Sequence, residues 1–175
     1  MPEFDREVTL RRLAQQLESI DSQRQMVELV SAELRGTLGY RTTWLSVISD
    51  DREELRVLAA ELSGGDDLWD SAVPLPIAGD RYVTRLIESG QPQVIVDAQV
   101  SEDVNREVVE QLGNRTVINV PVLLDGKMFG AIGTGTFGDE GPRPPSEDDL
   151  EYLRQLGEVA GVALSRVLRL AGHHA

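Results

Sequence analysis

The sequence contains no cysteine, and its only two histidines, His173 and His174, lie among the last three residues. The absence of thiols excludes disulfides, thiolate-ligated zinc or iron–sulfur clusters, thioether-linked chromophores and cysteine nucleophiles. Because no histidine lies in the body of the chain, we expect no histidine base and no haem ligand inside the domain. The sequence therefore predicts a colourless protein without a resident cofactor.

Basic residues are scarce: 17 Lys and Arg stand against 30 Asp and Glu, which gives a net charge of −13. Nucleic-acid binding relies on neutralising phosphates with basic groups, so this balance argues against it. Long apolar runs are also missing, since none approaches the ~20 residues that cross a membrane. The first five residues lack the basic and apolar regions of a signal peptide. We therefore expect a cytoplasmic protein that binds neither nucleic acid nor membrane.

An apolar stripe runs through the first part of the chain, from Leu10 to Leu38, at alternating spacings of three and four residues. This spacing is typical of an amphipathic helix packed on its own domain and also of a coiled-coil seam between two chains. We expect residues 24–37 to lie against a sheet and residues 6–22 to project towards a partner. The side chains expected in such a homodimer interface are Leu10, Leu13, Leu17 and Ile20, together with the final helix.

Five runs of β-branched and apolar residues predict strands, at residues 42–48, 55–62, 93–97, 116–124 and 128–137. Asp50-Asp51 separates the first two runs and suggests a hairpin. Asp125-Gly126 joins the last two, and an Asp-Gly turn between strands is a strong hairpin signal. The sequence therefore predicts a sheet with two hairpins.

Three further helices are predicted after the opening stripe. Asp80 is placed to cap a short helix, and residues 102–112 show apolar positions at helical spacing. Ser146 and Asp149 resemble a capping box that begins a long helix over residues 146–170. The order of elements indicates an α+β fold, which we divide into a helical lead (1–23), one domain (24–170) and a tail (171–175).

These elements, in this order, resemble the GAF domain family. The resemblance rests on WLSVISDD, PLPIAGDRYVTRLIESGQPQVIVDA, VINVPVLLDGKMFGAIGTGTF and PSEDDLEYLRQLGEVAGVALSRVLRL. It implies an antiparallel sheet of five to six strands, with the long N- and C-terminal helices on one face and short helices and loops forming a pocket on the other. It also implies a sensory or regulatory role in bacterial signal transduction, in which a separate output domain or protein responds.

The family's best-defined chemistries each require particular residues. Members that attach a bilin through cysteine or reduce free methionine sulfoxide with cysteines need thiols that this chain lacks, and haem-binding members need a core histidine. Cyclic-nucleotide members resemble the chain in the acidic pair Glu147-Asp148, but their Asn-Lys pair has no counterpart in residues 133–141. We therefore expect neither haem nor a covalently attached bilin, and a cyclic nucleotide is disfavoured.

Three polar residues are candidate ligand contacts. Asn119 lies within an apolar strand, where its amide is either a hydrogen-bonded structural group or a polar anchor in a mostly apolar pocket. Asp97 follows an apolar strand and serves either a turn or a ligand. Arg115 either forms an ion pair or holds an anionic ligand.

Six further residues complete the predicted site. Tyr82 and Val83 on the first short helix either cover the pocket or pack in the core. Ala131 and Gly133 lie on one face of the last strand, where small residues leave room for a ligand or a helix. The resemblance to the family suggests Leu45 and Val47 as the facing wall.

We interpret the chain as a non-catalytic sensory or regulatory domain that binds an unknown small molecule and couples it to the geometry of dimer helices. A ligand-free dimerisation module is the alternative. Catalysis by carboxylates is a weaker third hypothesis, because no spacing singles out a pair.

Overall fold

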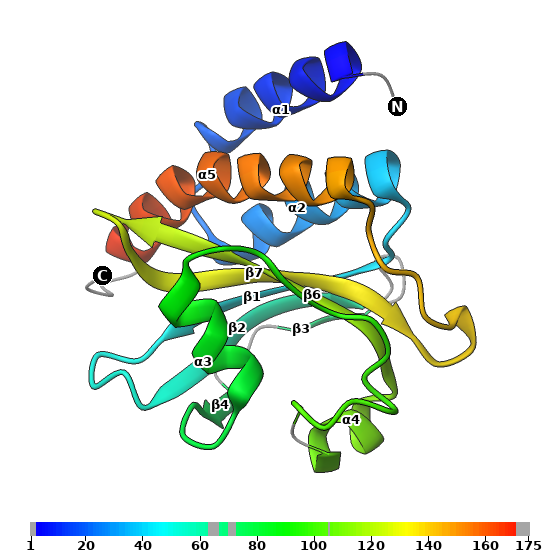
Figure 1. Ribbon diagram of the computed structural model, residues 1–175. Helices are drawn as coiled ribbons and strands as arrows, with labels where there is room; N and C mark the ends of the chain where they lie inside the picture. The colour runs from blue at the N-terminus through cyan, green and yellow to red at the C-terminus, as the bar shows by residue number, and fades with distance from the viewer. Residues whose placement is uncertain (1–2, 63–66, 70–72, 105, 171–175) are drawn as a thin grey trace.

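The computed structural model describes residues 3–62, 67–69, 73–104 and 106–170 (Figure 1). One antiparallel sheet forms the centre of the fold. Its strand β2 (Glu54–Leu62) pairs along one edge with both β3 (Asp67–Trp69) and β4 (Val73–Pro76). The strands across the sheet are β3 (Asp67–Trp69), β2 (Glu54–Leu62), β1 (Thr42–Ile48), β7 (Lys127–Phe137), β6 (Asn114–Leu124) and β5 (Gln93–Ile95).

Helices cover both faces of the sheet, as Figure 1 shows. The long helices α2 (Gln23–Leu38) and α5 (Glu147–Leu170) lie on one face, and α1 (Glu3–Leu17) packs on their outer side. The short helices α3 (Arg81–Ser89) and α4 (Arg106–Leu112) lie on the other face. The α+β fold with terminal helices on one face and short helices on the other is thereby confirmed. Within the described ranges, none of the helices is long and apolar enough to span a membrane.

Three turns and helix starts that were predicted from short sequence patterns are present in the structure. Asp125 and Gly126 adopt left-handed conformations, with φ of 53° and 77°, in the predicted hairpin between β6 and β7. The backbone N–H of Asp149 donates to Ser146 Oγ at 3.1 Å, and the Ser146 N–H donates to Asp149 Oδ2 at 3.2 Å. Asp80 Oδ1 accepts from the Val83 N–H at 2.9 Å and caps α3. These side-chain caps satisfy N–H groups that a helix start leaves free.

The expectation that residues 6–22 project towards a partner is wrong. The chain turns back after α1, and Ser22 caps α2 by accepting from the Gln25 N–H at 3.2 Å. The apolar stripe of α1 is then buried against α2 and α5 in the same chain. Its members are Leu10, Leu13, Leu17 and Ile20, each at most 7% exposed. The stripe is therefore an intramolecular core surface, which was the other interpretation of its spacing.

Arginine side chains hold α1 in this place. The Arg166 guanidinium on α5 donates to the backbone carbonyls of Leu17 and Ile20, at the end of α1 where helix carbonyls lack intrahelical partners. Arg6 donates to Asp149 Oδ1 at 2.6 Å near the other end of α1. Side-chain hydrogen bonds thus link α1 to α5 near both of its ends.

Candidate functional site

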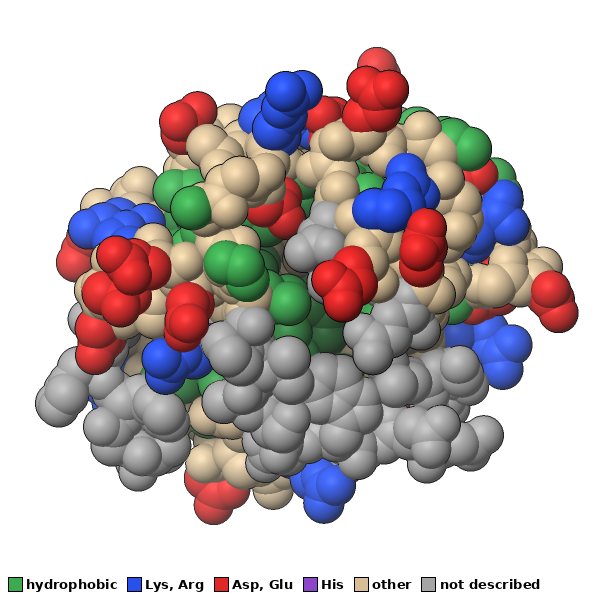
Figure 2. All heavy atoms as spheres, turned by 90° about the horizontal axis from the view of Figure 1, so that it is seen from below, with side chains coloured by type: hydrophobic (Ala, Val, Ile, Leu, Met, Phe, Trp, Pro, Cys, Tyr) green, Lys and Arg blue, Asp and Glu red, His purple; other side chains and the backbone are tan. Residues whose placement is uncertain are grey.

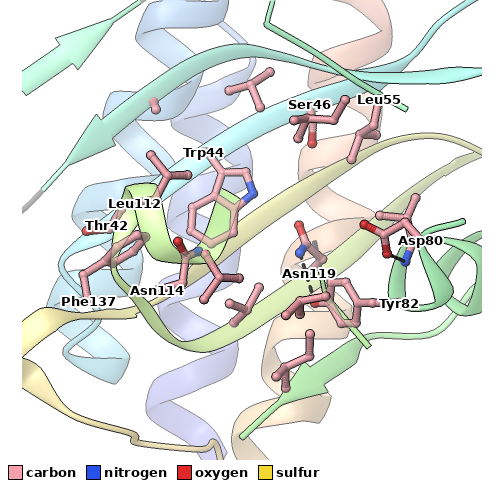
Figure 3. A pocket seen from close by; sticks show the side chains of 18 of the residues that line it. Thr42, Trp44, Ser46, Leu55, Asp80, Tyr82, Leu112, Asn114, Asn119 and Phe137 are labelled. Carbon is pink, nitrogen blue, oxygen red and sulfur yellow. Dashed lines mark hydrogen bonds between the residues drawn. The ribbon is translucent and has the colours of Figure 1, made fainter. Parts of the chain in front are cut away.

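A cavity of about 500 Å³ lies between the sheet and the short helices α3 and α4 (Figure 3). Seen from that side, hydrophobic side chains lie in a hollow with charged side chains around it (Figure 2). Strands β1, β2, β4, β5, β6 and β7 and both short helices contribute to its wall. The apolar side chains of this wall include Trp44, Leu55, Val57, Ala60, Leu75, Val83, Ile95, Val109, Leu112, Val117 and Phe137.

Strand β1 contributes alternate residues to the two faces of the sheet. Thr42, Trp44 and Ser46 line the cavity. Leu45 and Val47 instead belong to the core beneath the long helices, and Leu45 is only 1% exposed. Placing Leu45 and Val47 on the pocket wall was therefore wrong, because successive side chains of a strand point to opposite faces and the choice was off by one residue.

The small residues of β7 leave no free space for a ligand. A Cβ at Gly133 would lie 1.8 Å from Trp44 Cε2, so the indole of this neighbouring strand already fills the space above the glycine. Ala131 is fully buried in a cluster with Leu86 of α3 and with Met128. Neither Ala131 nor Gly133 lines the cavity, so the prediction that they contact a ligand is wrong. A helix and an aromatic ring cover them instead.

Tyr82, Val83 and Asn119 were all predicted as site residues, and all three line the cavity. Tyr82 and Asn119 also contact each other. Asn119 Nδ2 donates to the Tyr82 hydroxyl at 3.0 Å, and that hydroxyl donates to the Gln93 carbonyl at 2.9 Å. Burial raises the pKa of the Tyr82 phenol well above its ordinary value. The phenol therefore stays protonated and keeps both bonds at neutral pH.

Two amide oxygens of the cavity wall are buried without a partner among the described residues: Oδ1 of Asn119 and Oδ1 of Asn114. A buried acceptor without a donor costs about 1–3 kcal/mol, so such a group invites a donor from whatever occupies the cavity. Sequence reasoning missed Asn114, which directly follows the left-handed Gly113 at the start of β6. Its position two residues before an apolar run was the available signal.

Asp97 and Arg115 pair with each other outside the cavity. Arg115 Nε donates to Asp97 Oδ1 at 3.1 Å, and its NH2 group donates to Asp97 Oδ2 at 3.0 Å. The Arg115 hydrogen bonds lower the pKa of the Asp97 carboxyl. The ion pair was one of the two interpretations of Arg115. The prediction that Asp97 and Arg115 contact a ligand in the cavity is wrong, because neither lines it.

Asp80 is the one charged residue in the described wall of the cavity, and sequence reasoning recognised it only as a helix cap. Burial raises the pKa of its carboxyl, which the backbone hydrogen bonds from α3 partly offset. Among the residues that the structure describes, no group of three His, Asp or Glu side chains is placed to hold a metal ion. What the cavity offers a ligand is an apolar surface with hydrogen-bond acceptors.

Comparisons with known proteins agree with this architecture. Residues 21–165 match the GAF domain family, whereas a search of curated proteins finds no match. A GAF domain from a phosphoenolpyruvate-protein phosphotransferase of Coxiella burnetii is similar with a TM-score of 0.71 and 15% identity, over 97% of either chain.

Two further solved structures are similar. The phycoerythrobilin-bound GAF domain of a cyanobacterial phytochrome has a TM-score of 0.72 and 16% identity, over 98% of this chain and 100% of that one. Free methionine-R-sulfoxide reductase from Neisseria meningitidis, in complex with its substrate, has a TM-score of 0.67 and 15% identity, over 94% and 90%. At these identities the likeness establishes the fold.

Proposed function

Because this chain belongs to the GAF domain family of sensory and regulatory modules in signalling proteins, we propose that it is a non-catalytic sensor that binds a small organic molecule in its cavity. The observation that carries this proposal is the cavity of about 500 Å³, with apolar walls and the polar group of Asn119 directed into it. Small-molecule sites in proteins combine these features at this size.

Two similar structures support ligand binding in this fold, since one holds phycoerythrobilin and the other its substrate. This chain has no cysteine for a thioether bond and no histidine before residue 173. The proposed ligand is therefore not held by a thioether bond, and we propose neither haem nor a cysteine-linked bilin as its cofactor.

The sheet offers a direct route from the cavity to the long helices. Trp44 lines the cavity, whereas its neighbour Leu45 lies in the core with α2 and α5. A ligand that moves the indole displaces the backbone of β1 and with it the surface on which the long helices pack. We propose that this displacement alters a homodimer formed through the terminal helices, which an output domain or protein detects in the bacterial cytoplasm.

Native mass spectrometry of freshly purified protein tests this function. A homodimer that carries a co-purifying small molecule, lost on mild denaturation, is the expected result. A clean homodimer that also binds nothing from a fragment library would instead support a ligand-free dimerisation module. A monomer would contradict the proposed coupling through dimer helices.

A further inference from the structure

We infer that the cavity selects an uncharged or cationic, largely apolar molecule that donates hydrogen bonds to Asn119 Oδ1 and Asn114 Oδ1, and that it rejects anions. This inference rests on the function proposed above and specifies the chemistry of its ligand. Three observations carry it: the fixed orientation of the Asn119 amide, a second acceptor at Asn114 with no donor among the described residues, and the absence of Lys and Arg from the described wall.

The orientation of the Asn119 amide follows from its hydrogen-bond chain. The Tyr82 hydroxyl has one proton, which it donates to the Gln93 carbonyl at 2.9 Å. It can therefore only accept from Asn119, so the amide nitrogen must face the phenol, at 3.0 Å, and the amide oxygen must face the cavity. Asn119 is 6% exposed, and its oxygen has no donor in the described part of the chain.

Asn114 supplies a second acceptor at another part of the same cavity (Figure 3). Its side chain lies near Phe137, which packs edge-on against Trp44 with the ring centres 6.2 Å apart. Its Oδ1 is buried and, like that of Asn119, has no hydrogen-bond partner among the residues that the structure describes. A molecule with donors at two separated positions satisfies both oxygens, while its apolar body contacts the aromatic and aliphatic walls.

The distribution of charge excludes anions. None of the described residues that line the cavity is Lys or Arg, and the only charged one is the acid Asp80. The positions outside the described residues, which are 1–2, 63–66, 70–72, 105 and 171–175, contain no Lys or Arg. Arg115 is already paired with Asp97. A carboxylate or phosphate buried here would lose its hydration without gaining a counter-charge.

A matched set of indoles tests each element of this inference on the full chain. We would use 5-aminoindole with two donor groups, 5-methylindole with one, 1,5-dimethylindole with none, and indole-5-carboxylate as the anion. Isothermal titration calorimetry at neutral pH measures the four affinities. The expected affinity falls about tenfold with each donor removed, and the carboxylate does not bind.

Variants assign the donors to their acceptors. In Asn119→Leu or Asn114→Leu, one acceptor is lost, and the preference for 5-aminoindole over 1,5-dimethylindole should shrink about tenfold. Arg115→Gln, which alters a residue outside the cavity, should retain the wild-type order. Circular dichroism verifies folding, and the wild-type series alone decides the class of ligand if a variant does not fold.

The outcomes separate this inference from the proposed function. Binding of indole-5-carboxylate as tight as that of 5-methylindole, or equal affinities for the donor-bearing and donor-free indoles, would overturn the inference but leave a small-molecule sensor. If none of the indoles binds, a fragment library of neutral, cationic and anionic molecules is screened by ligand-observed NMR. Hits confined to anions or to donor-free molecules would refute the inference, and no hit in any class would refute the sensor as well.

Discussion

Trp44 and Gly133 stand opposite each other on the neighbouring strands β1 and β7, and the Trp44 indole occupies the space that a side chain at residue 133 would fill. On the other side of β7, Gly133 is paired with Asn119 of β6. The glycine thus separates the aromatic and the polar group of the cavity wall. Its role is to let a large ring lie close to the sheet, which is a contact that only glycine permits.

Gly133→Ala should destabilise the domain by about 1–3 kcal/mol, because the new Cβ would lie 1.8 Å from Trp44 Cε2 and force the ring to move. Urea unfolding measures the loss. Gly36→Ala is the control, since none of the described residues has an atom within 4 Å of a Cβ at that helical position. The loss should shrink when Gly133→Ala is combined with Trp44→Val, and an undiminished loss in that double variant would contradict the assigned clash.

Much of the fold is predictable because its signals are local. The Asp125-Gly126 turn and the Ser146–Asp149 cap depend on residues within a few positions of each other, and the structure has both. The α1 stripe is different, because the same spacing suits a seam within one chain or between two. Only the turn after α1, with Ser22 as the cap of α2, decides between them.

The cavity was only partly predictable, for a reason visible in β1. Both faces of this strand are covered, so its sequence TTWLSVI shows no clear alternation of polar and apolar residues from which to choose a face. The small residue Gly133 indicated space, but a neighbouring strand supplies the ring that fills it. Asn119 fits both of its interpretations, since its nitrogen donates to Tyr82 and its oxygen has no donor within the described part of the chain.

Leu13→Asp tests the intramolecular place of α1. Leu13 is 1% exposed in the chain's own core, so a carboxylate there should cost about 3 kcal/mol or more. Val8→Asp on the same helix is the control, since Val8 is 44% exposed and should tolerate the change. Thermal unfolding compares the two variants. A Leu13→Asp protein as stable as the wild type, but with half its mass, would restore the interpretation of α1 as a dimer seam.

Val162→Asp tests the proposed homodimer. Val162 lies on α5 and is 76% exposed, so it is available to a second copy, whereas the stripe of α1 is not. The charge should weaken association without lowering the stability of the separated chain. Light scattering over a range of concentrations reports the mass. An unaltered dimer would show that the interface does not include this face of α5.

Alkaline titration tests the burial of the tyrosines. Burial is the largest influence on Tyr40, Tyr82 and Tyr152, and it raises the pKa of each above the ordinary value of 10.0. Because the folded state holds the phenol protons more tightly than the unfolded state, the stability that these tyrosines contribute is fully present below pH 10.0. This contribution to the free energy of unfolding is lost as the pH rises through the folded-state pKa values. Tyrosinate absorbance at pH 10 should therefore be lower than that of exposed tyrosines, which are half ionised at that pH. Ionisation in the folded protein equal to that of exposed tyrosines would contradict the packing of these rings.

Two adjacent alanines of β2 allow the cavity to be filled with an internal control. Ala60 lines the cavity, whereas Ala59 lies in the core beneath the long helices, and both are fully buried. In Ala60→Leu the added atoms point towards the cavity, and neighbouring side chains can shift into its open volume, so the free energy of unfolding should change less than in Ala59→Leu while indole binding is lost. Ala59→Leu has no such space and should lose about 1–3 kcal/mol through overpacking. Urea unfolding and calorimetry with 5-aminoindole compare the variants, and equal destabilisation by both would mean that the cavity is closed by packing in solution.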